Sequence, residues 1–199
     1  MIEFIDVCKT DPYQHFIKLY NEANNHSQEH IEAAAVSTAS HDNKPSSRFV
    51  NIKYVHNESF IFFSNYNSVK GKDIQSNPQA SILFFWSKTN TQIRLEGKIT
   101  KTSNSFSDDH FQRRSYEKNI SAIISNRSSE NIGYSNLIQR YEKAIKAYKG
   151  KDLSRPMSWG GYSFVPKSFE FWQGENTRLN KRLKFSIKEN IWSSRYLDP

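Results

Sequence analysis

Apolar side chains recur at helical spacing near the start of the chain. After Asp11 and Pro12, large or small apolar residues stand at positions 16, 19, 20 and 23, a spacing that puts them on one face of a helix. Asp11 is expected to cap this helix, and Pro12 to occupy its first turn, where a missing N–H costs no hydrogen bond. The polar segment 24–32 is expected to end the helix, and residues 1–10 to form a short N-terminal arm.

Short runs rich in Val, Ile and Phe follow, and turn-forming residues separate them. The runs predict five strands, at 33–39, 47–55, 60–64, 80–86 and 91–102. Because short connections join them, we expect an antiparallel meander that closes into a barrel and so has no exposed edge. Between the third and fourth strands, residues 68–77 predict a short helix that ends before Pro78.

The second half of the chain changes from a helical pattern back to a strand pattern. Apolar residues recur at helical spacing between 107 and about 150, and strands are predicted at 162–165, 168–172, 182–187 and 191–197. Neither a repeat nor a linker interrupts the chain. The pattern therefore predicts one α+β domain, mainly β, over residues 1–199, in which helices flank an antiparallel β-barrel.

Composition excludes several classes of protein. The 199 residues include 14 Phe, 10 Tyr and 4 Trp, large apolar groups that a disordered chain lacks. Cys8 is the one cysteine, which excludes a disulfide scaffold and a cysteine-based zinc site. No apolar run reaches the roughly 18–20 residues of a membrane span, and the acidic start shows no secretory signal. We expect a cytoplasmic protein with no membrane partner.

Positive charge is concentrated in the second half of the chain. The net charge is +8, and residues 1–109 carry 11 basic and 12 acidic side chains, whereas residues 110–199 carry 17 and 8. Such an excess points to an anionic partner. The basic residues of segment 139–151 fall on one helical stripe, which a solvated helix surface explains, and no clear aromatic platform for nucleic acid accompanies them. We therefore favour a small anionic ligand over nucleic acid.

One motif resembles a metal site. His26, Glu29 and His30 match the HxxEH pattern of inverted zinc proteases, in which both histidines share one helix face. Here the segment is polar and leads directly into a predicted strand, so we expect a solvated loop and no metal. The glycine motifs of Rossmann and P-loop nucleotide sites are missing.

Cationic and polar side chains stand at positions where a plain barrel does not need them. Arg48 and Lys53 bracket the apolar segment FVNI, and Lys70 stands at a predicted helix start, where free N–H groups attract anions. The further members are Gln92, Arg114, Lys118, Arg178, Asn180 and Arg182. Each alone fits an ordinary surface residue, but with Phe63 and Trp172 the set outlines a cationic cleft with aromatic walls. On a flat strand Arg48 and Lys53 face opposite sides, so their joint use requires a twist or a bulge.

Five segments, in order and spacing, resemble the pyridoxine (pyridoxamine) 5′-phosphate oxidase family. They are SRFVNIK, FIFFSNYNSVKGKDIQSNP, FFWSKTNTQIRLEGK, SWGGYSFVP and EFWQGENTRLNKR. The resemblance is nearly collinear from residue 11 to residue 199. It implies an FMN-binding split β-barrel that forms a homodimer, with two FMN molecules at the subunit interface.

The resemblance implies roles for individual residues. Cations that hold the FMN phosphate correspond to Arg48, Lys53 and Lys70. Other FMN contacts, in part from the second subunit, correspond to Phe63, Ser64, Gln92, Ser128, Trp172 and Arg182. The set that grips the substrate phosphate corresponds to Lys53, His110, Arg114 and Lys118, joined by Arg178. The pair Arg178 and Asn180 corresponds to the catalytic residues beside the substrate.

The chain departs from the family pattern mainly on the substrate side. His110 and Lys118 stand where a tyrosine and a serine are usual, and Asn180 replaces a histidine. On the cofactor side Val69 replaces an arginine of the FMN-phosphate site, and Arg127 stands where a glutamine is usual and offers a replacement cation. We therefore expect a flavoprotein with an altered substrate pocket for a small anionic aromatic compound.

The resemblance implies an FMN-dependent oxidase. The family reaction oxidises the 4′ carbon of pyridoxine or pyridoxamine phosphate, passes a hydride to the flavin and uses O2 to reoxidise it, which gives hydrogen peroxide. Two alternatives stay open. One is an oxidase of the same scaffold that acts on another anionic aromatic substrate, as phenazine-biosynthesis oxidases do; the other is a flavin- or pyridoxal-phosphate-binding protein without turnover.

Overall fold

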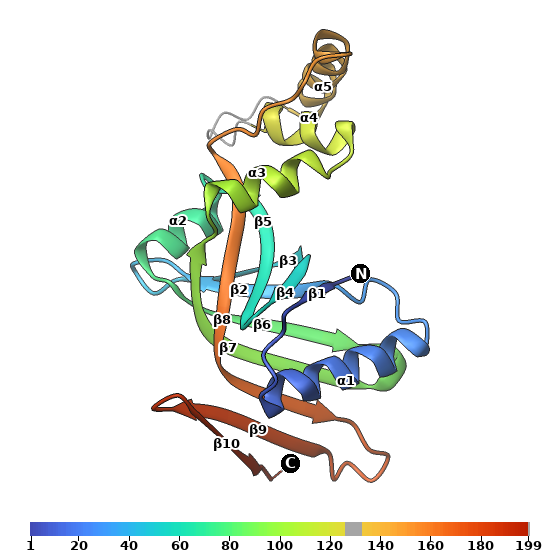
Figure 1. The fold of residues 1–199 in the computed structure, drawn as a ribbon, viewed down its shortest axis with the longest axis vertical. Coiled ribbons are helices and arrows are strands. Elements are labelled where there is room, and N and C mark those ends of the chain that lie inside the picture. Colours follow the sequence, from blue (N-terminus) through green and yellow to red (C-terminus); the bar gives the residue numbers. More distant parts are fainter. Residues whose placement is uncertain (126–132, 199) are drawn as a thin grey trace.

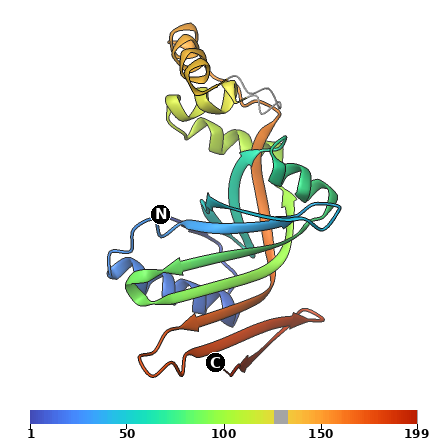
Figure 2. The same ribbon diagram turned by 180° about the vertical axis from the view of Figure 1, so that it is seen from behind.

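The computed structural model describes residues 1–125 and 133–198, and within them ten strands form one curled sheet that five helices flank (Figures 1 and 2). The helices are α1 (Asp11–Asn25), α2 (Val69–Ser76), α3 (Asn104–Gln112), α4 (Tyr116–Ile124) and α5 (Tyr134–Tyr148), with a 3-10 turn at Ser87–Thr89. The strands are β1 (Glu3–Ile5), β2 (Ala33–Ala39), β3 (Pro45–Asn51), β4 (Tyr54–His56), β5 (Ser59–Asn65), β6 (Gln79–Trp86), β7 (Thr91–Lys101), β8 (Trp159–Gln173), β9 (Lys181–Lys188) and β10 (Ile191–Tyr196). No helix among these residues has the length and apolar character of a membrane span.

The strands do not pair in chain order. Their order is β1-β4-β5-β8-β7-β6-β2-β3, and the β9–β10 hairpin pairs with β8. Strand β8 lies between β5 and β7, and β2 lies between β6 and β3, so the predicted meander is wrong. Strand β1, in the predicted N-terminal arm, pairs in parallel with β4. A local hydrophobic pattern predicts strands but carries no information on which distant strands become neighbours.

Two strand boundaries differ from the prediction. The predicted strand 47–55 is two strands, because the pairing changes at Lys53. The Ile52 N–H still donates to the Glu32 carbonyl beside β2, whereas the Lys53 N–H donates to the Ile61 carbonyl and the Lys53 carbonyl accepts from the Glu3 N–H. Conversely, segments 162–165 and 168–172 belong to the single long strand β8. The register shifts by one residue opposite Glu96 and Gly97, and this bulge lets β8 pass Pro166 without a break.

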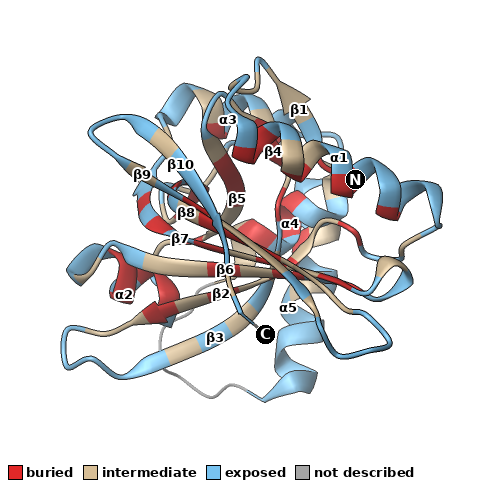
Figure 3. Ribbon diagram, turned by 90° about the horizontal axis from the view of Figure 1, so that it is seen from below, coloured by how far each residue is buried: buried red, intermediate tan, exposed pale blue. Residues whose placement is uncertain are grey.

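Helix α1 fills the inside of the curled sheet. Thr10, rather than Asp11, is the N-cap, because its extended backbone carbonyl accepts the first helical hydrogen bonds, from the N–H groups of Tyr13 and Gln14. The predicted apolar face is confirmed: Phe16 is buried, and its ring centroid lies 5.0 Å from that of Phe60 on β5. Figure 3 shows buried residues on α1 and on the long strands around it.

The three helices α3, α4 and α5 form a second packed unit at one end of the molecule, and β9 and β10 lie at the other end (Figures 1 and 2). Phe111, Ile120 and Trp159 form the centre of the apolar cluster under these helices. The predicted helix at 68–77 is confirmed as α2, and the hydroxyl of its N-cap Ser68 accepts from the Gly71 N–H at 3.3 Å. Any side chain at Gly71 would meet the Tyr66 carbonyl, since a Cβ there would lie 2.0 Å from that oxygen.

Candidate functional site

A cavity of about 520 Å³ lies between the curled sheet and helices α3 and α4. Its walls come from β3, β5, β8, the start of α2 and the α3–α4 region. The lining residues are Arg48, Phe49, Val50, Asn51, Lys53, Phe63, Ser64, Lys70, His110, Arg114, Lys118 and Trp159. Five of these described residues are cations and none is a carboxylate, so the cavity has the charge of an anion-binding site.

The break between β3 and β4 brings Arg48 and Lys53 to the same cavity. On one continuous strand their side chains would face opposite sides. Because residues 52 and 53 lie outside both strands, Lys53 turns to the side on which Arg48 lies, and both line the cavity. The joint use expected from the sequence is therefore possible without a bulge.

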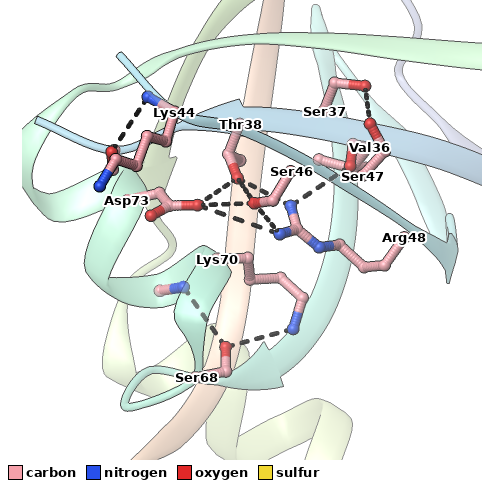
Figure 4. A network of polar contacts seen from close by, with 12 residues as sticks. Val36, Ser37, Thr38, Lys44, Ser46, Ser47, Arg48, Ser68, Lys70 and Asp73 are labelled. Atoms are coloured by element: carbon pink, nitrogen blue, oxygen red, sulfur yellow. Dashed lines mark hydrogen bonds and ion pairs between the residues drawn. The ribbon is translucent and has the colours of Figure 1, made fainter. Parts of the chain in front are cut away.

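The guanidinium of Arg48 belongs to a polar network at one wall (Figure 4). Its Nη1 donates to Thr38 Oγ1 at 2.7 Å, and its Nη2 donates to Ser46 Oγ. The buried carboxylate of Asp73, on α2, lies 3.9 Å from Nη2. Burial lowers the pKa of Arg48 and the Asp73 charge opposes that shift, so the arginine stays positive at neutral pH.

Lys70 lies at the same wall. Its side chain is buried, and Nζ donates to Ser64 Oγ at 2.7 Å. Nζ also donates to Ser68 Oγ at 3.2 Å (Figure 4). The residue stands in the first turn of α2, where free N–H groups and the helix dipole favour an anion. One end of the cavity thus combines two fixed cations, a hydroxyl and a helix N-terminus.

Parallel rings form another wall. The rings of Phe63 and His110 lie 3.6 Å apart between centroids at an interplanar angle of 8°, and the Trp159 ring lies 5.4 Å from Phe63 at 17°. The Arg114 guanidinium lies over Trp159, with Cζ 4.4 Å from the ring centroid. Flat apolar surfaces capped by a cation suit a planar ring that carries an anionic group.

His110 is neutral in this cavity. Burial lowers its pKa to about 4, and the nearby charges of Arg114, Lys53 and Arg113 act in the same direction. Its Nδ1 lies 2.7 Å from the hydroxyl of Tyr54, a group whose own pKa is raised by burial. The protonated Tyr54 hydroxyl is therefore suited to donate to Nδ1, which leaves the proton of the neutral ring on Nε2.

Arg114 has spare donor capacity. Its Nη2 donates to the Lys118 carbonyl at 3.1 Å, whereas its Nη1 is buried and makes no hydrogen bond. A buried guanidinium nitrogen without an acceptor is costly. Arg114 and the neighbouring Lys118 both line the cavity, so they form a second candidate anion-binding position.

The remaining described members of the predicted set lie elsewhere on the chain. Gln92, Trp172 and Arg182 stand directly opposite one another on β7, β8 and β9, so their side chains share one face of the sheet. Glu170 accepts from Arg182 Nε at 3.1 Å and from Nη2 at 2.8 Å, and its other oxygen accepts from Arg94. This buried carboxylate holds the Arg182 guanidinium in place.

Arg178 and Asn180 lie in the turn between β8 and β9. Arg178 is exposed and has a φ of 62°. Asn180 Oδ1 accepts from the Glu175 N–H at 3.1 Å, so its side chain stabilises the turn. Arg127 and Ser128 lie outside the described residues.

In a single chain, the predicted site residues lie in two separate groups. Strand β8 carries Trp159, in the cavity, at its first position and Trp172, in the second group, near its last. The two residues are thirteen positions apart, so the strand between them is on the order of 40 Å long at an extended rise. The cavity group therefore lies at the α3–α4 end and the second group at the β9 end (Figure 1).

Several residues of this site were not predicted from the sequence. Tyr54 contacts His110, and Asp73 contacts Arg48. Asp73 lies in the segment FIFFSNYNSVKGKDIQSNP, but the sequence predicted no role for either residue. Trp159 stands in the segment SWGG, whose resemblance to the family was the available signal. The motif His26–His30 forms a turn after α1, and the described residues hold no group of three or more potential metal ligands.

Comparison with known proteins agrees with this arrangement. Residues 22–146 match the family model described as pyridoxamine 5′-phosphate oxidase, and residues 159–199 match the model of the pyridoxine 5′-phosphate oxidase C-terminal dimerisation region. The chain is 38% identical to a pyridoxine/pyridoxamine 5′-phosphate oxidase of Leptospira biflexa over 95% of its own length and 89% of that protein. It is 40% identical to the chloroplastic pyridoxine/pyridoxamine 5′-phosphate oxidase 1 of Arabidopsis thaliana over 91% of its length, but spans 34% of that longer protein.

Solved structures share the fold. PhzG from Burkholderia lata, in complex with tetrahydrophenazine-1-carboxylic acid, superposes with a TM-score of 0.90 at 26% identity and covers 95% of this chain and 93% of its own. An FMN-binding protein related to pyridoxamine 5′-phosphate oxidase, from Nostoc punctiforme, superposes with a TM-score of 0.78 at 16% identity over 96% of this chain and 100% of its own. The split-barrel fold predicted from the sequence is confirmed.

Proposed function

The chain belongs to the pyridoxine/pyridoxamine 5′-phosphate oxidase family, and we propose that it is an FMN-dependent oxidase of pyridoxine or pyridoxamine 5′-phosphate. The observation that carries the proposal is the cavity of about 520 Å³, in which cations line two separate positions beside stacked aromatic rings. Two phosphates, one on the cofactor and one on the substrate, match two cationic positions better than a single anion does.

The residues at the α2 end fit the phosphate of FMN. Arg48 and Lys70 supply charge, Ser64 supplies a hydroxyl, and α2 supplies its N-terminus. Phe63 supplies an apolar surface for a ring. When bound, FMN accepts a hydride from the substrate and passes the electrons to O2, which gives hydrogen peroxide.

The residues at the α3–α4 end fit the substrate phosphate. Arg114, Lys53 and Lys118 supply positive charge at this end of the cavity. Neutral His110 adds a hydrogen-bonding ring without adding charge. By holding one anionic group, these residues orient the substrate ring against the cofactor position, which is the main contribution of a protein to a cofactor reaction.

A second subunit completes the site in this proposal. Gln92, Trp172 and Arg182 would reach the partner's cofactor, and Arg178 and Asn180 the partner's substrate, as the catalytic pair. The match of residues 159–199 to a dimerisation region supports this arrangement. The roles of Arg127 and Ser128 stay predictions.

An apolar hollow of about 400 Å³ beside the cavity fits the subunit contact. It is lined by Glu29, His30, Ala33, Ala35, Phe49, Leu83 and Phe85. Phe49 and Phe85 are 77% and 56% exposed in the single chain, and exposed aromatic side chains in one patch are typical of an interface. Phe49 lines both the hollow and the cavity, so a partner seated here reaches the site.

Anaerobic mixing of the flavin-loaded protein with pyridoxamine or pyridoxine 5′-phosphate tests the proposal. The expected result is bleaching of the flavin absorption, followed by return of the colour and formation of hydrogen peroxide when air is admitted. Protein that binds no FMN, or whose flavin neither substrate reduces, would contradict the proposal.

A second candidate function is the oxidation of a reduced aromatic carboxylate. It is supported by the similarity to PhzG, whose structure contains a tetrahydrophenazine carboxylic acid. The departures at His110, Lys118 and Asn180 lie in the groups assigned to the substrate, and Lys118 adds a cation that suits a carboxylate equally well. Bleaching by tetrahydrophenazine-1-carboxylic acid but not by the vitamin phosphates would establish this function. Tight ligand binding without any bleaching would indicate a binding protein without turnover.

A further inference from the structure

Asp73 is a buried carboxylate behind the cationic wall. It is 6% exposed and stands on α2, three residues after Lys70. It lies in the segment FIFFSNYNSVKGKDIQSNP, but the resemblance assigns it no role and it does not line the cavity. A buried carboxylate costs free energy unless it is paired and hydrogen-bonded, so its partners indicate what it does.

Two hydroxyl groups connect Asp73 to Arg48 (Figure 4). Thr38 Oγ1 donates to Asp73 Oδ2 at 2.7 Å, and Ser46 Oγ donates to the same oxygen at 3.0 Å. Each hydroxyl oxygen also accepts from a terminal nitrogen of Arg48. Because the carboxylate takes the hydroxyl protons, the hydroxyl lone pairs face the guanidinium, and the direction of every bond in the network is determined.

The same network sets the distance between two cations. Asp73 and Lys70 belong to one helix, whereas Thr38, Ser46 and Arg48 belong to the β2–β3 hairpin. Asp73 therefore ties the hairpin to the helix that carries Lys70. Lys70 itself is held by Ser64 and Ser68, so both cations are fixed relative to one another.

We propose that Asp73 is a positioning residue that holds the Arg48 guanidinium in register with Lys70 for binding one phosphate group. The proposal rests on the proposed function, in which that phosphate belongs to FMN. The charge of Asp73 and its positioning role have opposite effects on the affinity for FMN. A carboxylate near an anion site weakens binding by repulsion, so its neutralisation alone tightens FMN binding, whereas loss of positioning weakens it.

The first experiment compares FMN with riboflavin, which lacks the phosphate. Dissociation constants are measured by quenching of flavin fluorescence for the wild type and for Asp73→Asn. We expect FMN to bind about tenfold more weakly to the variant, as for loss of one well-placed charged hydrogen bond, with riboflavin binding unchanged. The exposed Asp152 provides the control, since Asp152→Asn removes the same charge far from the network. An FMN affinity that is unchanged or higher in Asp73→Asn, or an equal loss for both flavins, would overturn the proposal.

A double-mutant cycle tests whether Asp73 acts through Arg48. In the Arg48→Ala background, Asp73→Asn should cause no further loss of FMN affinity. Additive losses would contradict the proposal. Ser46→Ala removes one of the two hydroxyl connections and should weaken FMN binding by a smaller factor, and it serves as the working variant if Asp73→Asn does not fold.

Nitrogen-15 NMR of the Arg48 side chain tests positioning without flavin. Terminal guanidinium N–H groups that are held in hydrogen bonds give resolved, slowly exchanging Nη–H signals, which we expect for Arg48 in the wild type and expect to be broadened or lost in Asp73→Asn. An unchanged signal would refute positioning. Absence of FMN binding by the wild type, with the NMR change intact, would refute the proposed cofactor and leave the positioning role of Asp73 standing.

Discussion

The hydroxyl oxygen of Tyr54 lies 2.7 Å from Nδ1 of His110, and the two residues come from β4 and α3, 56 positions apart in the chain. The His110 ring is also stacked on Phe63. Burial and three nearby cations hold the pKa of His110 at about 4. Tyr54 thus fixes the orientation of a ring that stays uncharged inside a cationic cavity.

His110 should titrate far below an ordinary histidine. In an NMR titration of the six histidines, we expect one signal, missing in His110→Gln, to titrate near pH 4. Because the unfolded chain takes up this proton near pH 6.5, the free energy of unfolding should fall as the pH is lowered from about 6.5 to 4. His110→Gln should reduce that pH dependence. A His110 signal that titrates near pH 6.5 would contradict the assignment.

Two variants that are inactive alone should restore activity together. Arg114→Ala damages the cavity and Arg178→Ala damages the group assigned to the partner's site. In a mixed dimer one site carries both changes and the other carries neither. Coexpression should therefore give about a quarter of wild-type activity, because half of randomly paired dimers are mixed. Arg114→Ala coexpressed with Lys118→Ala is the matched control, since both changes lie in the cavity, and recovery there would disprove a shared site.

A charge in the apolar hollow should separate the subunits. Phe85→Glu places a carboxylate on a surface that is exposed in the single chain, so the fold should persist while an interface there loses its apolar contact. We expect a monomer by light scattering, with unchanged far-ultraviolet circular dichroism and with flavin lost. Tyr134→Glu, on a more exposed aromatic of α5, should stay dimeric. A dimeric Phe85→Glu protein would place the interface elsewhere.

An arginine at position 69 should strengthen FMN binding. Val69 is exposed at the first position of α2, next to Lys70, and an added guanidinium there reaches the helix end that we assign to the phosphate. One further charged hydrogen bond contributes about 1.5 kcal/mol, or roughly tenfold in affinity. The measurement is the dissociation constant of Val69→Arg for FMN and for riboflavin. A higher affinity for both flavins, or for neither, would argue against a phosphate at this end.

Local features of this protein follow from local sequence. The apolar face of α1 comes from helical spacing, strand β2 has the predicted limits, and α2 begins at Ser68 because its hydroxyl can cap the first turn. Cationic residues of the cavity could also be predicted from the sequence, because Arg48, Lys53 and Lys70 stand in segments that resemble the family. Each of these depends on residues within a few positions of one another.

What the tertiary structure decided depends on distant contacts. The position of β8 between β5 and β7, the break at Ile52 that turns Lys53 toward Arg48, and the pairing of Tyr54 with His110 all join segments far apart in the chain. Asp73 could not be recognised for the same reason, because its partners lie on another element. By itself the sequence determined most of the helices and strands and the chemical groups that they carry. Long-range strand pairing determined which groups meet in the cavity and which lie at the other end of the chain, because that pairing depends on the packing of the whole core rather than on any local pattern.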